Sequence, residues 1–151
     1  MTGFTRCTFT LKRLYSEDWV CAVARDSHFG DQLSLKHYLA ASHIVVATYG
    51  GVQTIPDKQL AAVGAKRSSS IRVPYFGVAL QCLSGTELVP TLTTGMTSAV
   101  KRNRDLRLVK APQELRPFYL LMAWHPRLSS DPPHVWLRQA VRSAAGSLIG
   151  S

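Results

Sequence analysis

The sequence has 151 residues, of which 46% are hydrophobic and 18% are charged, and its formal net charge is +9. This length allows one ordinary domain or two small lobes, the balanced composition argues against disorder, and no stretch approaches the ~18 apolar residues of a membrane helix. Because no signal peptide is apparent and the three cysteines are widely spaced, we expect a cytoplasmic protein with no membrane partner, no disulfide framework and no metal site.

Strands and helices are expected to alternate along the chain. Residues 4–15 alternate in polarity and predict a first strand with one apolar face. Apolar β-branched runs predict strands, and apolar residues at helical spacing predict helices. In chain order the further elements are a strand over residues 18–24, a short helix capped by Ser34, a strand over 43–48, a helix over 57–63 with Gly64 as its C-cap, a strand over 70–74, a helix over 76–83, a strand over 88–92, a helix over 97–101, strands over 106–109 and 118–124, and a helix over 135–148.

The last helix is expected to fold back on the sheet after a turn at His125-Pro126, with Asp131 as its N-cap. Its apolar residues lie near one face, namely Val135, Leu137, Val141, Ala145 and Leu148. Strands separated by short helices imply an α/β fold with a mostly parallel sheet and helices on both faces.

The positive charge raises the possibility of a nucleic-acid partner. Only two dense basic clusters occur, at residues 66–67 and 101–104, and neither is interleaved with aromatic residues. A solvated basic surface is therefore favoured over a DNA-binding face, and a free-standing DNA-binding protein is kept as an alternative.

Five segments together resemble one known family. They read "EDWVCAVARDSHFG", "LSLKHYLAASHIVV", "RVPYFGVA", "TELVPTLTTGM" and "FYLLMAWHPRLSSDPPHVWLRQAV". In this order they resemble the effector-binding region of LysR-type transcriptional regulators, especially the branch that responds to salicylate-like and nitroaromatic compounds. The resemblance extends from about Leu11 to Arg142.

The resemblance implies a type 2 periplasmic-binding-protein fold, in which crossing strands join two α/β lobes and a ligand lies in the cleft. Residues 1–151 would be a partial effector-binding domain, with residues 25–117 as the second lobe and residues 1–24 and 118–151 as remnants of the first. The winged helix-turn-helix domain of the family is absent from the sequence, so DNA would be contacted only through that missing domain. The implied partners are a small effector, an aromatic acid or a nitroaromatic compound, and further copies of the chain in a homo-dimer or higher homo-oligomer.

Four places are candidate ligand-binding sites. His28 matches a family position close to the effector cleft, and its imidazole could donate to a phenolate or carboxylate; an exposed loop histidine is the alternative. Tyr49, Gly50 and Gly51 follow a strand end, where open α/β sheets bind ligands, although an ordinary turn has the same pattern. The remaining candidates also follow strands and offer aromatic surface and hydroxyls, with core packing as the alternative for Phe76: Tyr75, Phe76, Thr93 and Thr94.

Catalytic motifs are missing. His125 and His134 have no ligand partners at zinc spacing, Ser84-Gly85 lacks the nucleophile-elbow pattern, and no phosphate-binding glycine loop occurs. We therefore expect no enzyme, no catalytic residue and no cofactor. The predicted function is effector binding and oligomerisation within a transcriptional regulator, and the alternative is an oligomerisation module that has lost its ligand.

Overall fold

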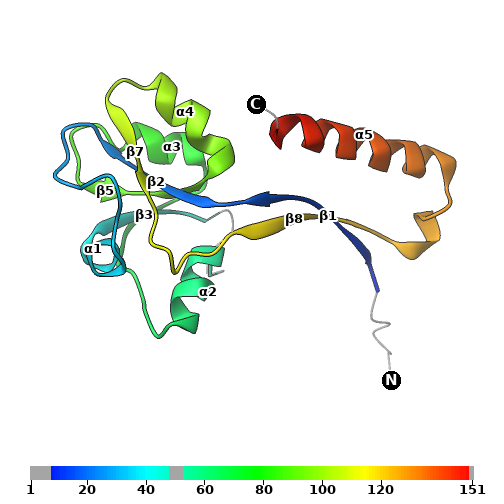
Figure 1. Cartoon of the computed structure of the whole chain (residues 1–151), viewed down its shortest axis with the longest axis horizontal. Coiled ribbons are helices and arrows are strands. Elements are labelled where there is room, and N and C mark those ends of the chain that lie inside the picture. Colours follow the sequence, from blue (N-terminus) through cyan, green and yellow to red (C-terminus); the bar gives the residue numbers. More distant parts are fainter. Residues whose placement is uncertain (1–7, 48–52, 150–151) are drawn as a thin grey trace. The chain divides into compact units, whose positions relative to one another are not determined.

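The computed structural model describes residues 8–47 and 53–149 (Figure 1). The chain forms two compact units: the lobe, which runs from Asp18 to Pro117, and the terminal unit, which contains the described residues on either side of it. The lobe starts at Asp18 rather than at residue 25, because the strand that begins at Trp19 pairs with two strands of the lobe. Within the described ranges, no helix combines the length and the apolar character that crossing a membrane requires.

The elements of the lobe alternate as expected. They are β2 (Trp19–Ala24), α1 (Leu35–Ala40), β3 (Ser42–Val46), α2 (Ile55–Ala62), β4 (Ser69–Val73), α3 (Phe76–Gln81), β5 (Leu88–Val89), β6 (Thr91–Thr93), the 3-10 helix η1 (Thr94–Met96), α4 (Thr97–Arg102) and β7 (Leu106–Lys110). The strand predicted over residues 88–92 is divided into β5 and β6, because Pro90 between them has no N–H to donate to a sheet.

The strands of the lobe form two three-stranded groups, one paired in parallel and one antiparallel, which together make a mixed sheet. β3 pairs in parallel with β4 and β5, whereas β2 pairs antiparallel with β6 and β7. The two groups meet where the Ala22 N–H donates to the Pro90 carbonyl at 3.3 Å, and β5 leads into β6 through the same proline. The α/β class expected from the sequence is confirmed, but the pairing within the lobe is mixed rather than mostly parallel, with two parallel and two antiparallel strand pairs.

Helices cover both faces of this sheet. Along β2, Cys21 and Val23 pack into one buried cluster and Ala22 packs into the other, as the two-residue period of a strand requires. The first cluster also contains Leu33, Tyr38, Ala41, Leu60, Val89, Val109 and Leu115. The second also contains Ile44, Val73, Ala79, Leu83, Leu92, Val100 and Leu106. The nearly continuous apolar sequence of β2 is therefore explained by burial on two sides.

Local hydrogen bonds fix where the helices begin and end. The Ser34 side chain accepts from the His37 N–H at 3.3 Å, which confirms Ser34 as the N-cap of α1. Thr54 and Asp57 form a reciprocal capping box, so α2 begins at Ile55, two residues before the predicted start. Gly64 follows α2 with φ +70°, a conformation in which a side chain would be strained.

The terminal unit contains a two-stranded ladder and a long helix. Its elements are β1 (Thr10–Glu17), β8 (Phe118–Trp124), the 3-10 helix η2 (Pro126–Leu128) and α5 (Pro132–Ile149). β1 pairs antiparallel with β8 from Thr10 opposite Trp124 to Glu17 opposite Phe118. Residues 4–7 of the predicted first strand lie outside the described residues.

The turn between β8 and α5 is held by its own polar groups. The Trp124 indole N–H donates to Ser129 Oγ at 3.1 Å, and Arg138 donates to the Ser129 carbonyl at 2.7 Å while its guanidinium lies over the Trp124 ring. The His134 N–H donates to the Asp131 carboxylate at 3.2 Å, so Asp131 caps α5 as predicted.

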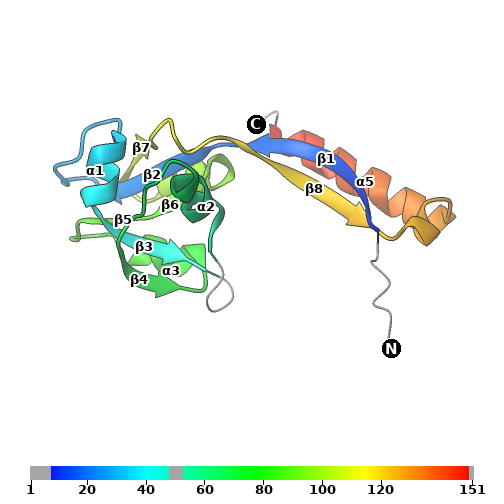
Figure 2. The same cartoon turned by 90° about the horizontal axis from the view of Figure 1, so that it is seen from below.

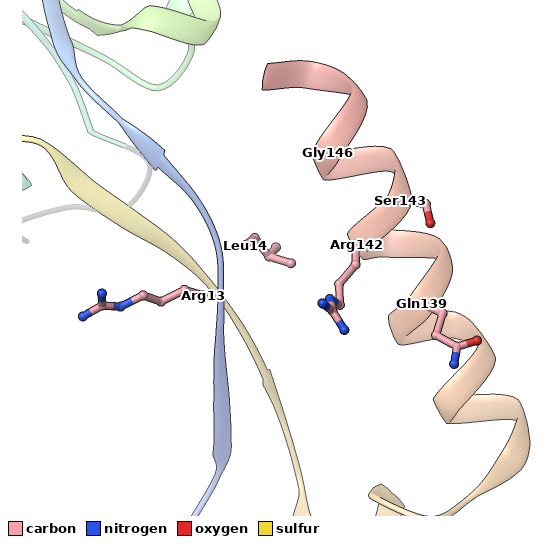
Figure 3. Close-up of a pocket in the computed structure, with 6 residues that line it drawn as sticks. All are labelled: Arg13, Leu14, Gln139, Arg142, Ser143 and Gly146. Carbon is pink, nitrogen blue, oxygen red and sulfur yellow. The ribbon is translucent and has the colours of Figure 1, made fainter. Parts of the chain in front are cut away.

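The helix α5 folds back toward β1 as predicted, but its apolar stripe is only partly buried. Leu137 is 48% exposed and Val141 is also exposed, as is the neighbouring Trp136. The space between α5 and β1 is instead a cavity of about 390 Å³ whose helical lining is largely polar, and Leu14 and Arg142 point into it from opposite sides (Figure 3). Within the stripe, Ala145 is buried and Val135 is half-buried, whereas Leu137 and Val141 are exposed.

Candidate functional site

Two of the predicted sites follow the carboxyl ends of neighbouring parallel strands. β3 and β4 end at one edge of the sheet, where Val46 pairs with Val73 (Figure 2). Tyr49, Gly50 and Gly51 follow β3 and lie outside the described residues. Tyr75 and Phe76 follow β4, and both are exposed, Tyr75 at 68%. Core packing of Phe76, the alternative considered above, is therefore not observed.

Thr93 and Thr94 lie at the same end of the sheet. Thr93 pairs with Trp19 at the start of β2, and β2 runs against the other strands, so its start is level with their carboxyl ends. The Thr94 N–H donates to the Asp18 carbonyl at 3.0 Å, and the Asp18 N–H donates to Thr94 Oγ1 at 3.4 Å. We call Tyr75, Phe76, Thr93 and Thr94 the carboxyl-edge residues.

His28 lies at the opposite edge of the sheet. It follows the end of β2 at Ala24, and it lines a cavity together with Ser42, which begins β3, and Glu87, which precedes β5. The six residues of β2 span about 20 Å at the usual rise of a strand. The structure therefore does not bring His28 together with the carboxyl-edge residues.

The cavity at His28 has a volume of about 470 Å³. His28 Nδ1 lies 2.7 Å from Glu87 Oε2, and the two side chains are 73% and 58% exposed. The His28 ring also contacts the Phe29 ring, with the centroids 4.3 Å apart. A contact between two side chains this exposed contributes little to stability. The cavity is a surface hollow with polar and apolar lining residues.

Sequence reasoning missed a second cavity in the lobe. It runs along α2 and β4, has a volume of about 430 Å³, and is here called the α2–β4 groove. Its lining residues are Val45, Gln53, Asp57, Leu60, Ala61, Ala65, Lys66, Arg67, Ser68, Ser69 and Arg72. From the sequence, the Lys66-Arg67 cluster was interpreted as solvated surface. In the structure Lys66 is exposed, as that interpretation requires, but Arg67 is buried.

Arg67 is the centre of a buried polar network, since only 4% of its side chain is exposed. Its Nε–H donates to Asp57 Oδ1 at 2.8 Å. Its terminal nitrogens donate to the hydroxyls of Tyr38, Thr54 and Thr91, each at 3.0 Å. One guanidinium thus connects α1, α2 and β6, and the geometry satisfies a charge that would otherwise be costly to bury.

The network changes the ionisation of its members. Burial raises the pKa of Asp57, but hydrogen bonds from Arg67 and Thr54 outweigh it and leave the pKa below its ordinary value. Burial raises the pKa of Tyr38 to about 12 and that of the Cys21 thiol to about 12. Cys21 is therefore protonated at neutral pH and is not a reactive thiolate.

His43 is a fully buried histidine of the core. Its Nδ1 lies 3.0 Å from the Val89 carbonyl and its Nε2 lies 2.6 Å from the Tyr38 carbonyl. Burial lowers the pKa of His43 more than these two carbonyls raise it. A neutral imidazole has one N–H, so His43 donates to only one of the two carbonyls. Because these carbonyls belong to α1 and β5, the side chain packs β3 against both elements.

The described residues contain no metal centre. Over these ranges, no three His, Cys, Asp or Glu side chains are grouped so that they could hold an ion. What the lobe offers chemically is hydroxyls, aromatic surface and cations next to apolar walls. This donor set is suited to binding a small polar or aromatic molecule.

Known structures place this fold among the regulatory domains of transcriptional regulators. The chain is 30% identical to the regulatory domain of MexT, a transcriptional activator in Pseudomonas aeruginosa, with a TM-score of 0.71, and the match covers 89% of this chain and 67% of that one. The regulatory domain of the LysR family regulator MetR from N. meningitidis has a TM-score of 0.74 at 10% identity over 96% of this chain and 67% of that one. The effector binding domain of QuiR in complex with shikimate has a TM-score of 0.76 at 11% identity over 97% and 69%. At such low identity the last two show the fold alone.

Curated relatives give the same answer. The HTH-type transcriptional regulator LinR of Sphingobium indicum is 30% identical over 85% of this chain and 43% of its own length. The HTH-type transcriptional regulator SyrM of Rhizobium meliloti is 26% identical over 90% of this chain and 42% of its own. The chain thus spans less than half the length of these relatives, and no protein-family model matches it.

The chain belongs to the LysR-type transcriptional regulators and corresponds to part of their effector-binding domain. The family resemblance and the periplasmic-binding-protein-like fold expected from the sequence are confirmed. These relatives are transcriptional regulators, so the expectation that the protein is not an enzyme is also confirmed.

Proposed function

We propose that the chain senses a small organic molecule in the cytoplasm and, without converting it, relays its presence to a separate DNA-binding domain of the regulator. The observation that carries this proposal is the meeting of strand ends at one edge of the lobe, with Tyr75, Phe76, Thr93 and Thr94 beside them. Open α/β sheets bind ligands beyond the carboxyl ends of their strands. The structure of the QuiR domain with shikimate supports a fold of this kind as a small-molecule receptor.

The ligand we propose is an aromatic acid or a nitroaromatic compound. Tyr75 offers an exposed ring with a hydroxyl, and Phe76 offers a second ring beside it. Thr93 and Thr94 add hydroxyls that can donate to a carboxylate or a nitro group. Tyr49, Gly50 and Gly51, which follow β3 in the sequence, belong to the same proposal.

The binding test is a thermal-shift screen with benzoate, salicylate and nitroaromatic analogues, followed by calorimetric titration of the best ligand. Thr94→Val and Tyr75→Ala are each expected to weaken binding about tenfold, since each removes a hydrogen-bonding group from the site. His28→Ala is the control, because His28 lies at the opposite edge, and it should leave the affinity unchanged. A loss with His28→Ala but not with Thr94→Val would move the site to the His28 cavity and contradict the proposal.

We also propose that the chain associates with itself. β4 pairs with β3 on one side, and no strand of the described residues pairs with its other side. Ile71 on β4 and Val78 on α3 are exposed large hydrophobic residues in the same part of the lobe as Tyr75 and Phe76. An unpaired edge next to exposed apolar side chains promotes association.

Sedimentation velocity over a concentration series is expected to show a dimer or a higher homo-oligomer. Val78→Glu should shift the distribution toward monomer, because it places a charge on the proposed contact. Leu137→Glu on α5 is the matched control, since it changes an apolar residue of the terminal unit that is somewhat more exposed than Val78, 48% against 39%. Monomer at all concentrations would contradict the proposal, whereas association without any ligand binding would favour the oligomerisation module.

A further inference from the structure

The α2–β4 groove combines an apolar floor with a basic rim. Ala61 of α2 and Ala65 of the segment after it supply accessible apolar surface, and the buried side chains of Val45 and Leu60 lie beneath them. Lys66, Arg67 and Arg72 supply three cations, and Ser68 and Ser69 supply hydroxyls. A volume of about 430 Å³ lies in the range of small-molecule sites.

The charges of the groove do not cancel. Its one acidic group, Asp57, is occupied on both oxygens: Oδ1 accepts from Arg67, and Oδ2 accepts from the backbone and hydroxyl of Thr54. Arg67 in turn is held by the network. Lys66 and Arg72 are exposed, and among the described residues neither has an ion-pair or hydrogen-bond partner.

We propose that the α2–β4 groove is a second binding site, which takes a small organic anion with an apolar body. Lys66 and Arg72 hold the carboxylate or phosphate group of the ligand, with Ser68 and Ser69 as further donors. The apolar body lies on Ala61 and Ala65. This site goes beyond the proposed function, because none of its residues is a carboxyl-edge residue.

Arg67 gives the site a rigid back wall. Its guanidinium is fixed by bonds to Asp57, Tyr38, Thr54 and Thr91, so it does not have to be ordered when a ligand arrives. Sites with ordered supporting groups bind with less entropic cost. A ligand bound in the groove therefore also raises the free energy of unfolding of the lobe.

The test is a fluorine NMR titration of the whole chain with 4-fluorobenzoate. The double variant Lys66→Gln with Arg72→Gln is expected to bind it at least about fivefold more weakly, since charge-assisted hydrogen bonds are the strong ones. Lys101→Gln with Arg102→Gln is the matched control: it removes the same two charges from exposed positions on α4 and should change nothing. Neutral 4-fluorobenzamide should bind more weakly than the acid to the unchanged chain.

A second pair of variants tests the apolar floor. Ala61→Leu fills the groove from α2 and should weaken binding, whereas Ala62→Leu, on the same helix but outside the groove, should not. Both positions are exposed helical alanines, so neither change threatens the fold.

The outcomes separate this site from the carboxyl edge. No saturable binding of 4-fluorobenzoate, or equal loss in the two charge variants, would overturn the groove proposal. Loss with Thr94→Val alone would overturn it too and leave the proposed function standing. Loss with Lys66→Gln and Arg72→Gln alone would support the groove and count against the carboxyl edge as the site for aromatic acids.

Discussion

Replacing Arg67 by methionine is expected to reduce the free energy of unfolding of the lobe by about 3 kcal/mol. Methionine keeps much of the volume but leaves the Asp57 carboxylate without its cation and removes the donor from three hydroxyls. Removing one partner of a buried pair leaves the other desolvated and unpaired, which is why the loss exceeds that of a surface pair. Urea unfolding followed by circular dichroism measures the change.

The neighbouring Lys66 provides the control. Lys66→Met makes a similar change one position away, where the side chain is exposed and has no partner among the described residues. Its effect should stay within about 0.5 kcal/mol. If the two variants differ by less than about 1 kcal/mol, the network does not hold the lobe together as inferred.

Leu60→Ala in α2 is expected to cost about 2–5 kcal/mol, and Leu137→Ala in α5 less than about 1 kcal/mol. Leu60 is fully buried in the cluster with Cys21 and Tyr38, and removing its methyl groups leaves a cavity that the sheet cannot close. Leu137 is 48% exposed, so the same substitution removes few contacts.

Urea unfolding with separate probes for the lobe and the terminal unit checks this pair. Both substitutions replace leucine by alanine within a helix, so the change in helix propensity is the same for both. The difference between their losses of unfolding free energy therefore reflects the difference in burial. A large cost at Leu137 would mean that the apolar stripe of α5 is covered in solution, by another copy of the chain or by a further segment.

The elements of the lobe could be predicted because their signals are local. The Ser34 side chain marks the start of α1, and the positive φ of Gly64 marks the end of α2. The unbroken apolar run of β2 predicts a buried strand. The division at Pro90 also follows from a local property, the missing N–H, and a stricter use of that rule would have found it.

The groove could not be predicted, because its decisive residue is defined by distant partners. Arg67 contacts Tyr38, Thr54, Asp57 and Thr91, and the periodicity of the sequence gives no sign of these contacts. His28 was predicted from the family resemblance alone. The structure places it at the other end of the sheet because β2 runs antiparallel to its neighbours, and the pattern of a strand does not state its direction.

The amphipathic pattern of α5 predicted the helix and its return to β1, but not that Leu137 and Val141 of its apolar stripe are exposed. Periodicity identifies which residues share a face, but the partner of that face is a property of the tertiary structure. Here Arg142 points toward β1 (Figure 3), and Leu137 and Val141 are exposed.

The pairing of Glu17 with Phe118, together with the 3.0 Å hydrogen bond from the Trp19 indole to the Arg116 carbonyl, brings the two ends of the lobe together. In topological terms β1 and β8 are the arms of a β-hairpin whose turn is the entire lobe, from Asp18 to Pro117. If that turn were unfolded, closing a loop of roughly 100 residues would cost about 4 kcal/mol, more than a two-stranded ladder can repay. The two strands therefore stay paired only while the lobe is folded. Arg67→Met is expected to speed hydrogen exchange of the β8 amides, although the Arg67 side chain has no hydrogen bond to β1 or β8.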